Sequence, residues 1–389
     1  MSLNSPVKKP RKTLKEFIGK YFLEGQILEI EKEFAEKPSW WDSFHEKHRK
    51  FIALLIPFVF IQSIWILTAF RFDFFRLYPT RWQIPLTMIF GSCISGMTSA
   101  GGGAVAFPVM TLLLNIDANT SRDYALMQQS IGMSTSMFVI VYMQIVVEKR
   151  AILLCGLGSI PGIIVGLTWL DELFNELAKK TFFIAVGASF AISLYMLNSE
   201  KKRIHYQTIP EFNTWKALVL LITGYVGGIC TALTGTGLDI VVFAILTLLF
   251  RVSEKTATPT TVVLQAINSI MGFYWRAIFE GHIPQLAWEY LAVTTPVSAT
   301  MAPLGSFLGS HFHRLVLAFM IYALEYLSVL GFLATQPPWE AMAIGAAIVV
   351  CGFIFFVIIM RIGKRIQKGV EKARHPIVAI RQIRHLEMP

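Results

Sequence analysis

The sequence predicts an all-α polytopic membrane protein, built from two related halves with an extra helix at each end. Three observations predict this fold class. The 389 residues are 54% hydrophobic and only 15% charged, whereas a soluble domain has about a quarter charged residues. The apolar residues fall into long blocks, and a helix needs roughly 20 of them to cross a bilayer. Two of these blocks are interrupted by glycine and resemble each other.

Two segments lie outside the two halves at each end of the chain. Apolar residues such as Phe17 and Tyr21 recur at roughly helical spacing within residues 1–50, which predicts an amphipathic basic arm. Residues 51–70 carry no charge and predict a transmembrane helix. The remaining outlying segments are a final transmembrane helix at 340–360 and a basic C-terminal tail at 361–389.

Each half contains one interrupted apolar stretch and about three continuous ones. Repeat 1 covers residues 84–197 and repeat 2 covers 215–334, with a basic loop at 198–214 between them. The interrupted stretches are 84–116, broken near Gly101 to Gly103, and 215–250, broken near Gly235 and Gly237. The continuous blocks are 123–147, 151–170 and 179–197 in repeat 1, and 257–279, 286–310 and 314–334 in repeat 2.

A shift of 136 residues aligns the two interrupted stretches without a gap. Leucine and phenylalanine match by chance in apolar sequence, but matched glycine, threonine and glutamine are harder to attribute to chance. The matched pairs include Gly91 with Gly227, Thr98 with Thr234, Gly101 with Gly237, and Gln129 with Gln265. A further pair of small-residue motifs, Gly162/Gly166 and Gly305/Gly309, predicts close helix packing.

Glycine-interrupted helices at matching positions of two halves are typical of a transporter site near the bilayer midplane. The free N–H groups at such a break favour an anion. The alternative is that the glycines only permit tight helix packing. If both stretches enter the membrane and return, they form an inverted pair, and the loops on the side of the termini carry slightly more basic residues. That side is then the cytoplasm or an organelle matrix; a plasma membrane and an organelle inner membrane both fit this pattern.

The stretch from Gly96 to Pro108 (GMTSAGGGAVAFP) resembles the first-repeat signature of the TauE/SafE family. Residues 121–136 resemble the helix that follows it, while Thr234 to Asp239 and Thr256 to Thr261 resemble the second-half counterparts. The resemblance spans about 84–334 and implies export of sulfite or organosulfonate anions. Three features depart from the family pattern: Leu238 and Asp239 in place of further glycine, no counterpart of Pro108, and the two outer helices.

These observations predict a secondary transporter of small sulfur-containing anions, with a site formed from both breaks and from two matching glutamines. The expected substrate-binding residues are Thr98, Ser99, Gly101, Gly102, Gly103, Thr234, Gly235, Gly237, Gln129 and Gln265. Weaker candidates are Ser134, Ser136, Asn268 and Ser269. For the glutamines, hydrogen bonding between helices is an equally weighted alternative.

Two acidic residues lie well inside apolar blocks, where an ionised group is costly. Asp239 lies in the second break and is a candidate for proton coupling, whereas Glu325 fits better as a neutral acid hydrogen-bonded to a neighbouring helix. Asp239 either carries a proton or indicates that anion binding has been lost. The second interpretation leads to an alternative function, a transport-inactive subunit that scaffolds a larger membrane complex through its N- and C-terminal tails.

Other functional classes lack their sequence signals. No phosphate-binding loop, zinc-site spacing or intramembrane protease box is present, so we expect no enzyme activity, no cofactor and no metal. The basic residues accompany no folded nucleic-acid-binding module, so the expected partners are membrane lipid, a small anion and other membrane subunits. The four cysteines, Cys93, Cys155, Cys230 and Cys351, are expected to be small buried apolar residues.

Overall fold

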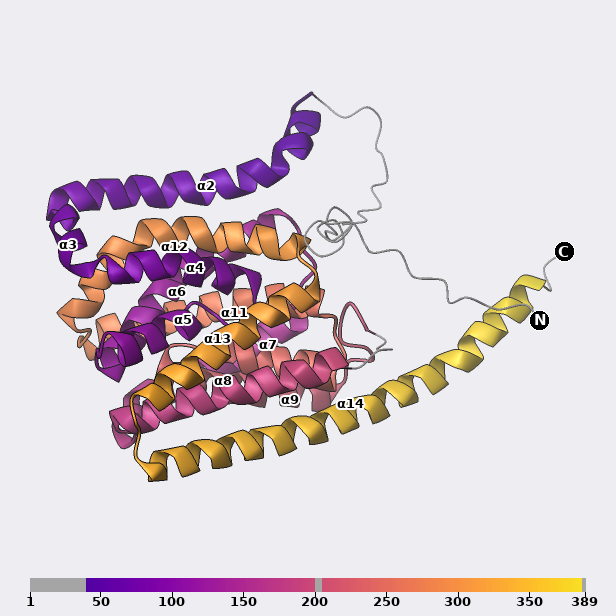
Figure 1. Cartoon of the computed structure of the whole chain (residues 1–389). Helices are drawn as coiled ribbons and strands as arrows, with labels where there is room; N and C mark the ends of the chain where they lie inside the picture. The colour runs from indigo at the N-terminus through magenta and orange to yellow at the C-terminus, as the bar shows by residue number, and fades with distance from the viewer. Residues whose placement is uncertain (1–39, 200–204, 387–389) are drawn as a thin grey trace, which may run out of the picture.

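The computed structural model describes residues 40–199 and 205–386, and this part of the chain is helical throughout apart from its turns and loops (Figure 1). The predicted amphipathic arm falls mostly on residues that lie outside this part. Eight of the described helices are long and apolar enough to cross a membrane. The all-α polytopic fold class is therefore confirmed.

Both predicted interruptions are present. In repeat 1, α4 (Gln83–Met97) ends before the break and α5 (Gly103–Pro108) follows it, continuing as the π-helical segment η3 (Val109–Leu113). In repeat 2, α9 (Thr214–Thr234) ends before the break, and α10 (Leu238–Ala244) continues as the π-helical segment η6 (Ile245–Leu249). The two π-helical segments lie at the predicted offset, so the backbone repeats as the sequence does.

Three longer helices follow each interrupted hairpin, as predicted. In repeat 1 they are α6 (Ala118–Tyr142), α7 (Lys149–Val165, extended by η4, Gly166–Leu170, and η5, Asp171–Leu173) and α8 (Glu176–Ser199). In repeat 2 they are α11 (Glu254–Tyr274, extended by η7, Trp275–Glu280), α12 (Gln285–His311) and α13 (Arg314–Ala334). The outer elements are α2 (Trp40–Phe72), η2 (Phe74–Leu77), α3 (Tyr78–Arg81) and α14 (Trp339–Leu386).

One end of the helix bundle, here called the Glu148 end, is closed by contacts among loops. The Glu148 carboxylate accepts a hydrogen bond from the Ile209 N–H (2.7 Å), and the Glu148 N–H donates to the Thr260 hydroxyl (2.9 Å). Tyr206 pairs through its backbone with the segment around Val252. The start of α9 and the end of η6 therefore lie together at this end of the bundle.

The opposite end, here called the Asp171 end, gathers a different set of residues. Asp171 forms an ion pair with Arg122 near the start of α6 (2.5 Å). Tyr124 packs edge-on against Tyr290 of α12 (ring centroids 6.1 Å apart), and Arg81, just before α4, lies 5.5 Å from the centroid of the same Tyr290 ring. The start of α4 and the start of α6 thus lie together at this end of the bundle.

The two outer helices both run between these ends (Figure 1). Arg49 of α2 donates to the Tyr142 carbonyl at the end of α6 (2.7 Å), and Arg251 donates to the Met360 carbonyl of α14 (3.3 Å). The beginning of α2 and the charged second half of α14 therefore share the Glu148 end. In the most apolar 18-residue stretch of each outer helix, only 11% is buried. Most of the apolar surface of α2 and α14 therefore faces outward.

Glycines let the helices of the two halves approach closely. A Cβ atom at Gly158 or Gly162 of α7 would overlap backbone atoms of α9, and one at Gly305 of α12 would overlap the Cys93 carbonyl of α4. Each interrupted hairpin thus packs on a helix of the other half. The predicted small-residue motifs have the packing role expected of small residues in lipid.

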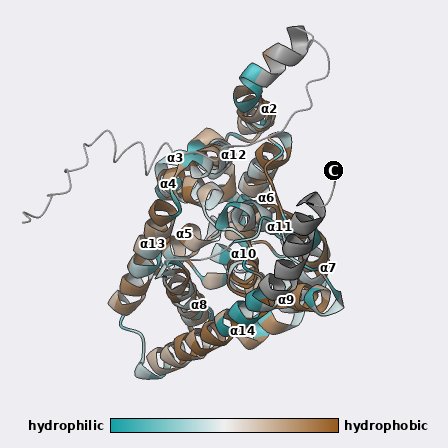
Figure 2. Ribbon diagram, turned by 90° about the vertical axis from the view of Figure 1, so that its right-hand side faces the viewer, coloured by the Kyte–Doolittle hydropathy of each residue, from teal (hydrophilic) through white to brown (hydrophobic). Residues whose placement is uncertain are grey.

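The central helix α6 differs from the prediction of an apolar block at 123–147. It begins at Ala118, ends at Tyr142, and is not among the helices apolar enough to be a membrane-span candidate. Most of its residues are nevertheless buried, because the other helices surround it. Figure 2 looks at the Glu148 end and shows hydrophobic residues concentrated on peripheral helices such as α8 and α13, with hydrophilic ones around α6 and α11.

The expectation for the cysteines was only partly right. Cys155 and Cys230 are buried, whereas Cys93 is half-buried and Cys351 is exposed on the outer face of α14. All four are free thiols. The error arose because an apolar block in a membrane protein includes a face that contacts lipid as well as one that contacts protein.

The close packing of α7 on α9 predicts that a methyl group at Gly158 is destabilising. Gly158→Ala would force α9 away from α7, which costs about 1–3 kcal/mol of unfolding free energy. Gly156→Ala is the matched control, because its new Cβ would meet only Leu264, at 3.8 Å, and Ala favours a helix by up to about 1 kcal/mol. Thermal unfolding of the purified variants in detergent measures both. Equal melting temperatures would contradict this packing.

Candidate functional site

The two breaks meet in the interior of the bundle. Gly101 has a left-handed backbone (φ 68°), and a Cβ atom there would lie within 2.5–2.8 Å of Asp239, Thr236 and Gln129. A Cβ atom at Gly103 would lie 2.9 Å from Gln129 Nε2 and 3.0 Å from Thr236. Glycine in the first break is therefore required for the second break to lie directly against it.

The matching glutamines join the two halves. Gln265 of α11 donates from Nε2 to Oε1 of Gln129 on α6 (3.2 Å), and Gln129 donates from Nε2 to the Gly235 carbonyl of the second break (2.6 Å). Both glutamines are fully buried. The hydrogen bond between them spans the same 136 residues that relate the two repeats. Equivalent residues of the two halves thus meet at the centre of the protein.

Asp239 satisfies the backbone of its own break. Its carboxylate accepts hydrogen bonds from the N–H groups of Gly237 (3.1 Å) and Ile240 (2.9 Å) and lies 3.3 Å from the Thr236 hydroxyl. The Leu238 N–H donates to the hydroxyl of Thr231 (3.0 Å). The Asp239 carboxylate therefore satisfies N–H groups at the first turn of α10, whereas the corresponding position before α5 is Gly103, which has no side chain to do so.

Several polar atoms around this centre are buried without a hydrogen-bond partner among the described residues. They are Oε1 of Gln265, both Oδ1 and Nδ2 of Asn268, Oε1 of Gln128 and Oγ of Ser136. Leaving one such group unsatisfied costs about 1–3 kcal/mol. Buried groups of this kind are normally satisfied by protein, water or a ligand. The set on α6 and α11 therefore marks a buried polar region beside the two breaks.

The other predicted binding residues lie close to this region, with different roles. Thr98 and Thr234 each bond their hydroxyl to the carbonyl one turn earlier, at 2.8 and 3.0 Å. Ser99 is buried in the first break. A Cβ atom at Gly102 would lie 2.5 Å from Gln128 Oε1. Thr236 and Gln128 were not predicted, although Gln128 directly precedes the matched Gln129 in the sequence.

Glu325 of α13 lies against Gly187 of α8 and is 4% exposed. A cavity of about 10 Å³ joins it to Thr234, Thr236 and Gly237 of the second break. Its Oε2 has no hydrogen-bond partner among the described residues, so the expected bond from this atom to a neighbouring helix is absent. The missing side chain of Gly187 provides the space in which this carboxyl group sits.

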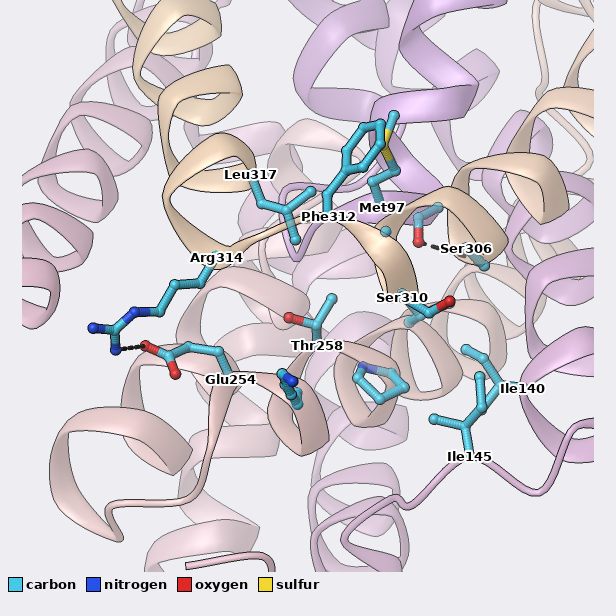
Figure 3. A pocket seen from close by; sticks show the side chains of 15 residues that line it. Met97, Ile140, Ile145, Glu254, Thr258, Ser306, Ser310, Phe312, Arg314 and Leu317 are labelled. Atoms are coloured by element: carbon cyan, nitrogen blue, oxygen red, sulfur yellow. Dashed lines mark hydrogen bonds and ion pairs between the residues drawn. The ribbon is translucent and has the colours of Figure 1, made fainter. Parts of the chain in front are cut away.

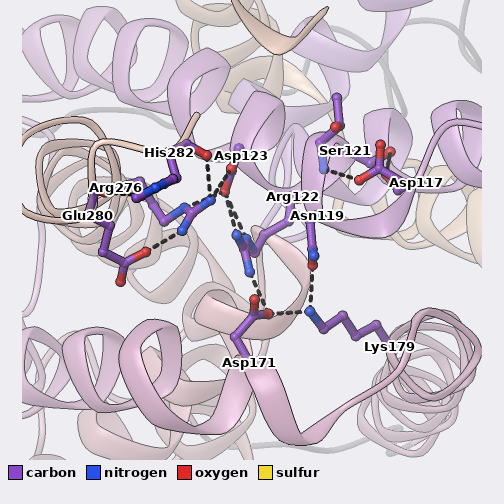
Figure 4. Close-up of polar contacts among 11 residues, drawn as sticks. Asp117, Asn119, Ser121, Arg122, Asp123, Asp171, Lys179, Arg276, Glu280 and His282 are labelled. Carbon is purple, nitrogen blue, oxygen red and sulfur yellow. Dashed lines mark hydrogen bonds and ion pairs between the residues drawn. The ribbon is translucent and has the colours of Figure 1, made fainter. Parts of the chain in front are cut away.

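A network of charged residues lies at the Asp171 end (Figure 4). Asp123 is fully buried and accepts hydrogen bonds from Arg122 (2.7 and 2.9 Å) and from Arg276 of η7 (2.8 and 3.0 Å). Arg122 and Lys179 each lie 2.5 Å from the Asp171 carboxylate. These ion pairs connect α6, α7, α8 and α11, so they join the two halves at this end.

Sequence reasoning missed this network. Asp123 stands at the edge of a predicted apolar block and Asp171 in a predicted loop, so neither was recognised as a buried acid. The available signal was the adjacent pair Arg122 and Asp123 directly before the matched glutamine helix. Two opposite charges at the start of a buried helix indicate either a solvated end or an ion pair, and the sequence does not contain the distance to Arg276 that decides between them.

Comparison with known protein families now adds an independent finding. A model described as sulfite exporter TauE/SafE matches residues 84–331. The chain belongs to this family. Comparisons with curated proteins and with solved structures gave no match. Family membership makes the chain a multi-pass membrane protein of a transporter family, and the predicted resemblance is confirmed.

The matched range contains both breaks, both glutamines and the charged network at the Asp171 end. It begins within α4 and ends within α13, so α2 and α14 lie outside it. The TauE/SafE core of this chain is therefore flanked by two helices whose apolar surface is mostly outward-facing.

The buried charge network predicts that Asp123→Asn is strongly destabilising. The change leaves Arg122 and Arg276 without their shared carboxylate, and breaking a buried ion pair costs about 3–5 kcal/mol. Asp73→Asn is the matched control, because Asp73 pairs with Arg76 at 3.6 Å on the surface, where such pairs contribute about 0–1 kcal/mol. Thermal unfolding in detergent measures both losses, and comparable losses would refute a structural role for the network.

Proposed function

We propose that this TauE/SafE protein is a secondary transporter of small sulfur-containing anions, of the sulfite or sulfonate type. The observation that carries the proposal is the meeting of both breaks beside buried polar atoms without partners on α6 and α11. A soluble anion crossing a bilayer needs such groups at the midplane, because lipid offers none. The family supplies the substrate class.

The residues have distinct proposed roles. The first break, from Thr98 to Gly103, lies against the substrate, because its glycine backbone faces the buried amide side chains of Gln128 and Gln129. The Nδ2 group of Asn268 donates to the anion oxygens, and Gln129 and Gln265 join it by exchanging their present Nε2 bonds within the protein for bonds to the anion. The second break, from Thr234 to Gly237, forms the opposite wall, with its own amides already bonded to Asp239 and Thr231.

We further propose that the two halves are an inverted pair that rocks around this site. The hairpin of each half opens at a different end of the bundle, which supports opposite orientations in the membrane. The Glu148 end carries Lys149, Arg150 and the basic part of α14, which favours the cytoplasmic or matrix side. Sidedness of an impermeant thiol label at Thr258→Cys tests this assignment, and labelling only from the opposite side overturns it.

A second candidate function is a scaffold subunit that no longer transports. Two observations favour it: Asp239 fills the start of α10 with a carboxylate, and the outward apolar surfaces of α2 and α14 are available to neighbouring membrane subunits. The tails would extend this contact surface. A scaffold would co-purify from native membranes with stoichiometric partners and would show no uptake in isolation.

Uptake of isotope-labelled sulfite into proteoliposomes tests transport, with Gly101→Ala as the site variant. The new methyl group would enter the space of Asp239, Thr236 and Gln129, so we expect uptake to fall about tenfold or more. Gly281→Ala is the matched control, because Gly281 also has a left-handed backbone (φ 65°) but open space around it. It incurs a similar backbone strain of about 1–2 kcal/mol and should retain uptake.

The outcomes separate the two candidate functions. Uptake by the natural protein that is lost only in Gly101→Ala supports the central site. Uptake that survives in both variants places the site elsewhere. No uptake of sulfite, sulfate or a small sulfonate by the natural protein would favour the scaffold function and would direct attention to its partners in native membranes.

We propose that Asp239 carries the coupled proton, so transport by Asp239→Asn should no longer respond to a proton gradient. The asparagine oxygen can still accept bonds from Gly237 and Ile240, so the fold is retained. A small alkanesulfonate is the appropriate substrate, because its charge does not change with pH. Glu325→Gln is the matched variant and should keep its gradient dependence. Loss of the dependence only in Glu325→Gln would assign the proton to Glu325 instead.

A further inference from the structure

A cavity of about 80 Å³ lies at the Glu148 end, where α4, α11, α12 and α13 come together (Figure 3). Its walls include Met97 from the last turn of α4, Thr258 of α11 and Ser310 of α12. A single water needs roughly 10–15 Å³ in such a space. The cavity is therefore large enough for a small hydrated ion or an oxyanion.

A second cavity of about 30 Å³ continues from the first toward the centre of the protein. The two share Met97, Thr258 and Arg314 in their walls. The second one adds Thr98 and Ser99, which belong to the first break. These adjoining spaces thus lie between the Glu148 end and one wall of the proposed central site.

Charged side chains at the outer part of this path are mostly basic. Arg314 and Lys255 both line the larger cavity, together with one acid, Glu254. Arg314 stands at the start of α13, and Glu254 and Lys255 at the start of α11. Two cationic groups against one carboxylate in the wall of this cavity raise the local concentration of anions relative to cations.

The pairing of Arg314 with Glu254 is loose. The closest nitrogen and oxygen atoms are 3.9 Å apart, compared with about 2.7–2.9 Å in a tight charge-assisted hydrogen bond. The Arg314 side chain keeps 38% of its surface exposed, and Figure 3 shows the pair on one side of the cavity. The guanidinium group therefore keeps N–H donors available for another oxyanion, since its ion pair with Glu254 is longer than a hydrogen bond.

We propose that Arg314 forms an entry site for the sulfite or sulfonate anion, where the anion displaces Glu254 before it moves to the first break. This inference rests on the proposed transport function. Guanidinium N–H groups bind oxyanions in a forked geometry that an ammonium group cannot reproduce. Glu254 acts as the resident counter-charge, which keeps Arg314 paired when no substrate is present and competes with the substrate when it arrives.

Charge-selective thiol labelling tests this site without relying on transport. Thr258→Cys, in a background with Cys93→Ala and Cys351→Ser, is labelled with two methanethiosulfonate reagents, one carrying a sulfonate and the other a trimethylammonium group. The ratio of the two rates reports the preference for an anion, because changes in thiol reactivity cancel. We expect the sulfonate reagent to be preferred, and Arg314→Gln to lower the ratio about tenfold.

Two further variants distinguish a binding role from a structural one. Glu254→Gln should shift the ratio in the opposite direction and lower the KM for sulfite, because the competing carboxylate is gone. Arg314→Lys keeps the charge, so it should keep most of the ratio but raise the KM. Arg150→Gln is the control, because Arg150 lies at the same end over the ring of Phe212 and does not line either cavity.

The outcomes separate this inference from the proposed function. If the natural protein takes up sulfite while Arg314→Gln changes neither the labelling ratio nor the KM, the entry site is wrong and the transport function stands. An equal fall of the ratio in Arg150→Gln would likewise overturn it, since a general surface charge would then explain the preference. A ratio that falls only in Arg314→Gln, with no uptake of sulfite, sulfate or a small sulfonate by the natural protein, supports the anion site and refutes transport.

Discussion

The free backbone groups at two interrupted helices constrain the rest of this structure. In hydrocarbon each unsatisfied N–H or C=O costs several kcal/mol, so a break is stable only where protein or a polar cavity covers it. The second break uses Asp239 and Thr231 for this purpose, and the first break lies directly against the second. Each half thus covers the break of the other, and this requirement brings both hairpins to the centre.

The position of α6 follows from that arrangement. It passes beside both breaks, and its amide side chains bond to the second break and to α11. A helix with this much polar surface is unstable in contact with lipid, so the apolar helices of both halves surround it. Those helices approach closely enough because glycines such as Gly158 and Gly305 leave room for a neighbouring backbone. The polar helix α6 can therefore lie at the centre only because glycines in the surrounding helices let those helices pack closely around it.

Features that follow from the register between the two halves were predictable from sequence, and features that depend on tertiary distances were not. The register between the halves is visible in matched glycine, threonine and glutamine residues. One shift of 136 residues therefore relates the two breaks, η3 with η6, and Gln129 with Gln265. The ion pairs of Asp123 with Arg276 and the placement of Glu325 against Gly187 depend on tertiary distances, which no local pattern records. The exposure of Cys351 was missed for a related reason, because hydropathy does not separate a lipid-facing position from a buried one in an apolar helix.

The register also shows that the halves are complementary rather than equal. The counterpart of Asp239 in the first half is Gly103, and the Asp239 carboxylate lies close to where a Cβ atom of Gly101 would be. Two aspartates in these positions would place carboxylates close together, and two glycines would leave the first turn of α10 without its acceptor. Repeat 2 supplies the carboxylate of Asp239, and the glycines of repeat 1 leave room for it. Exchanging the conformations of the halves during transport would therefore not be energetically neutral, and the two end states of the proposed rocking motion are expected to differ in free energy.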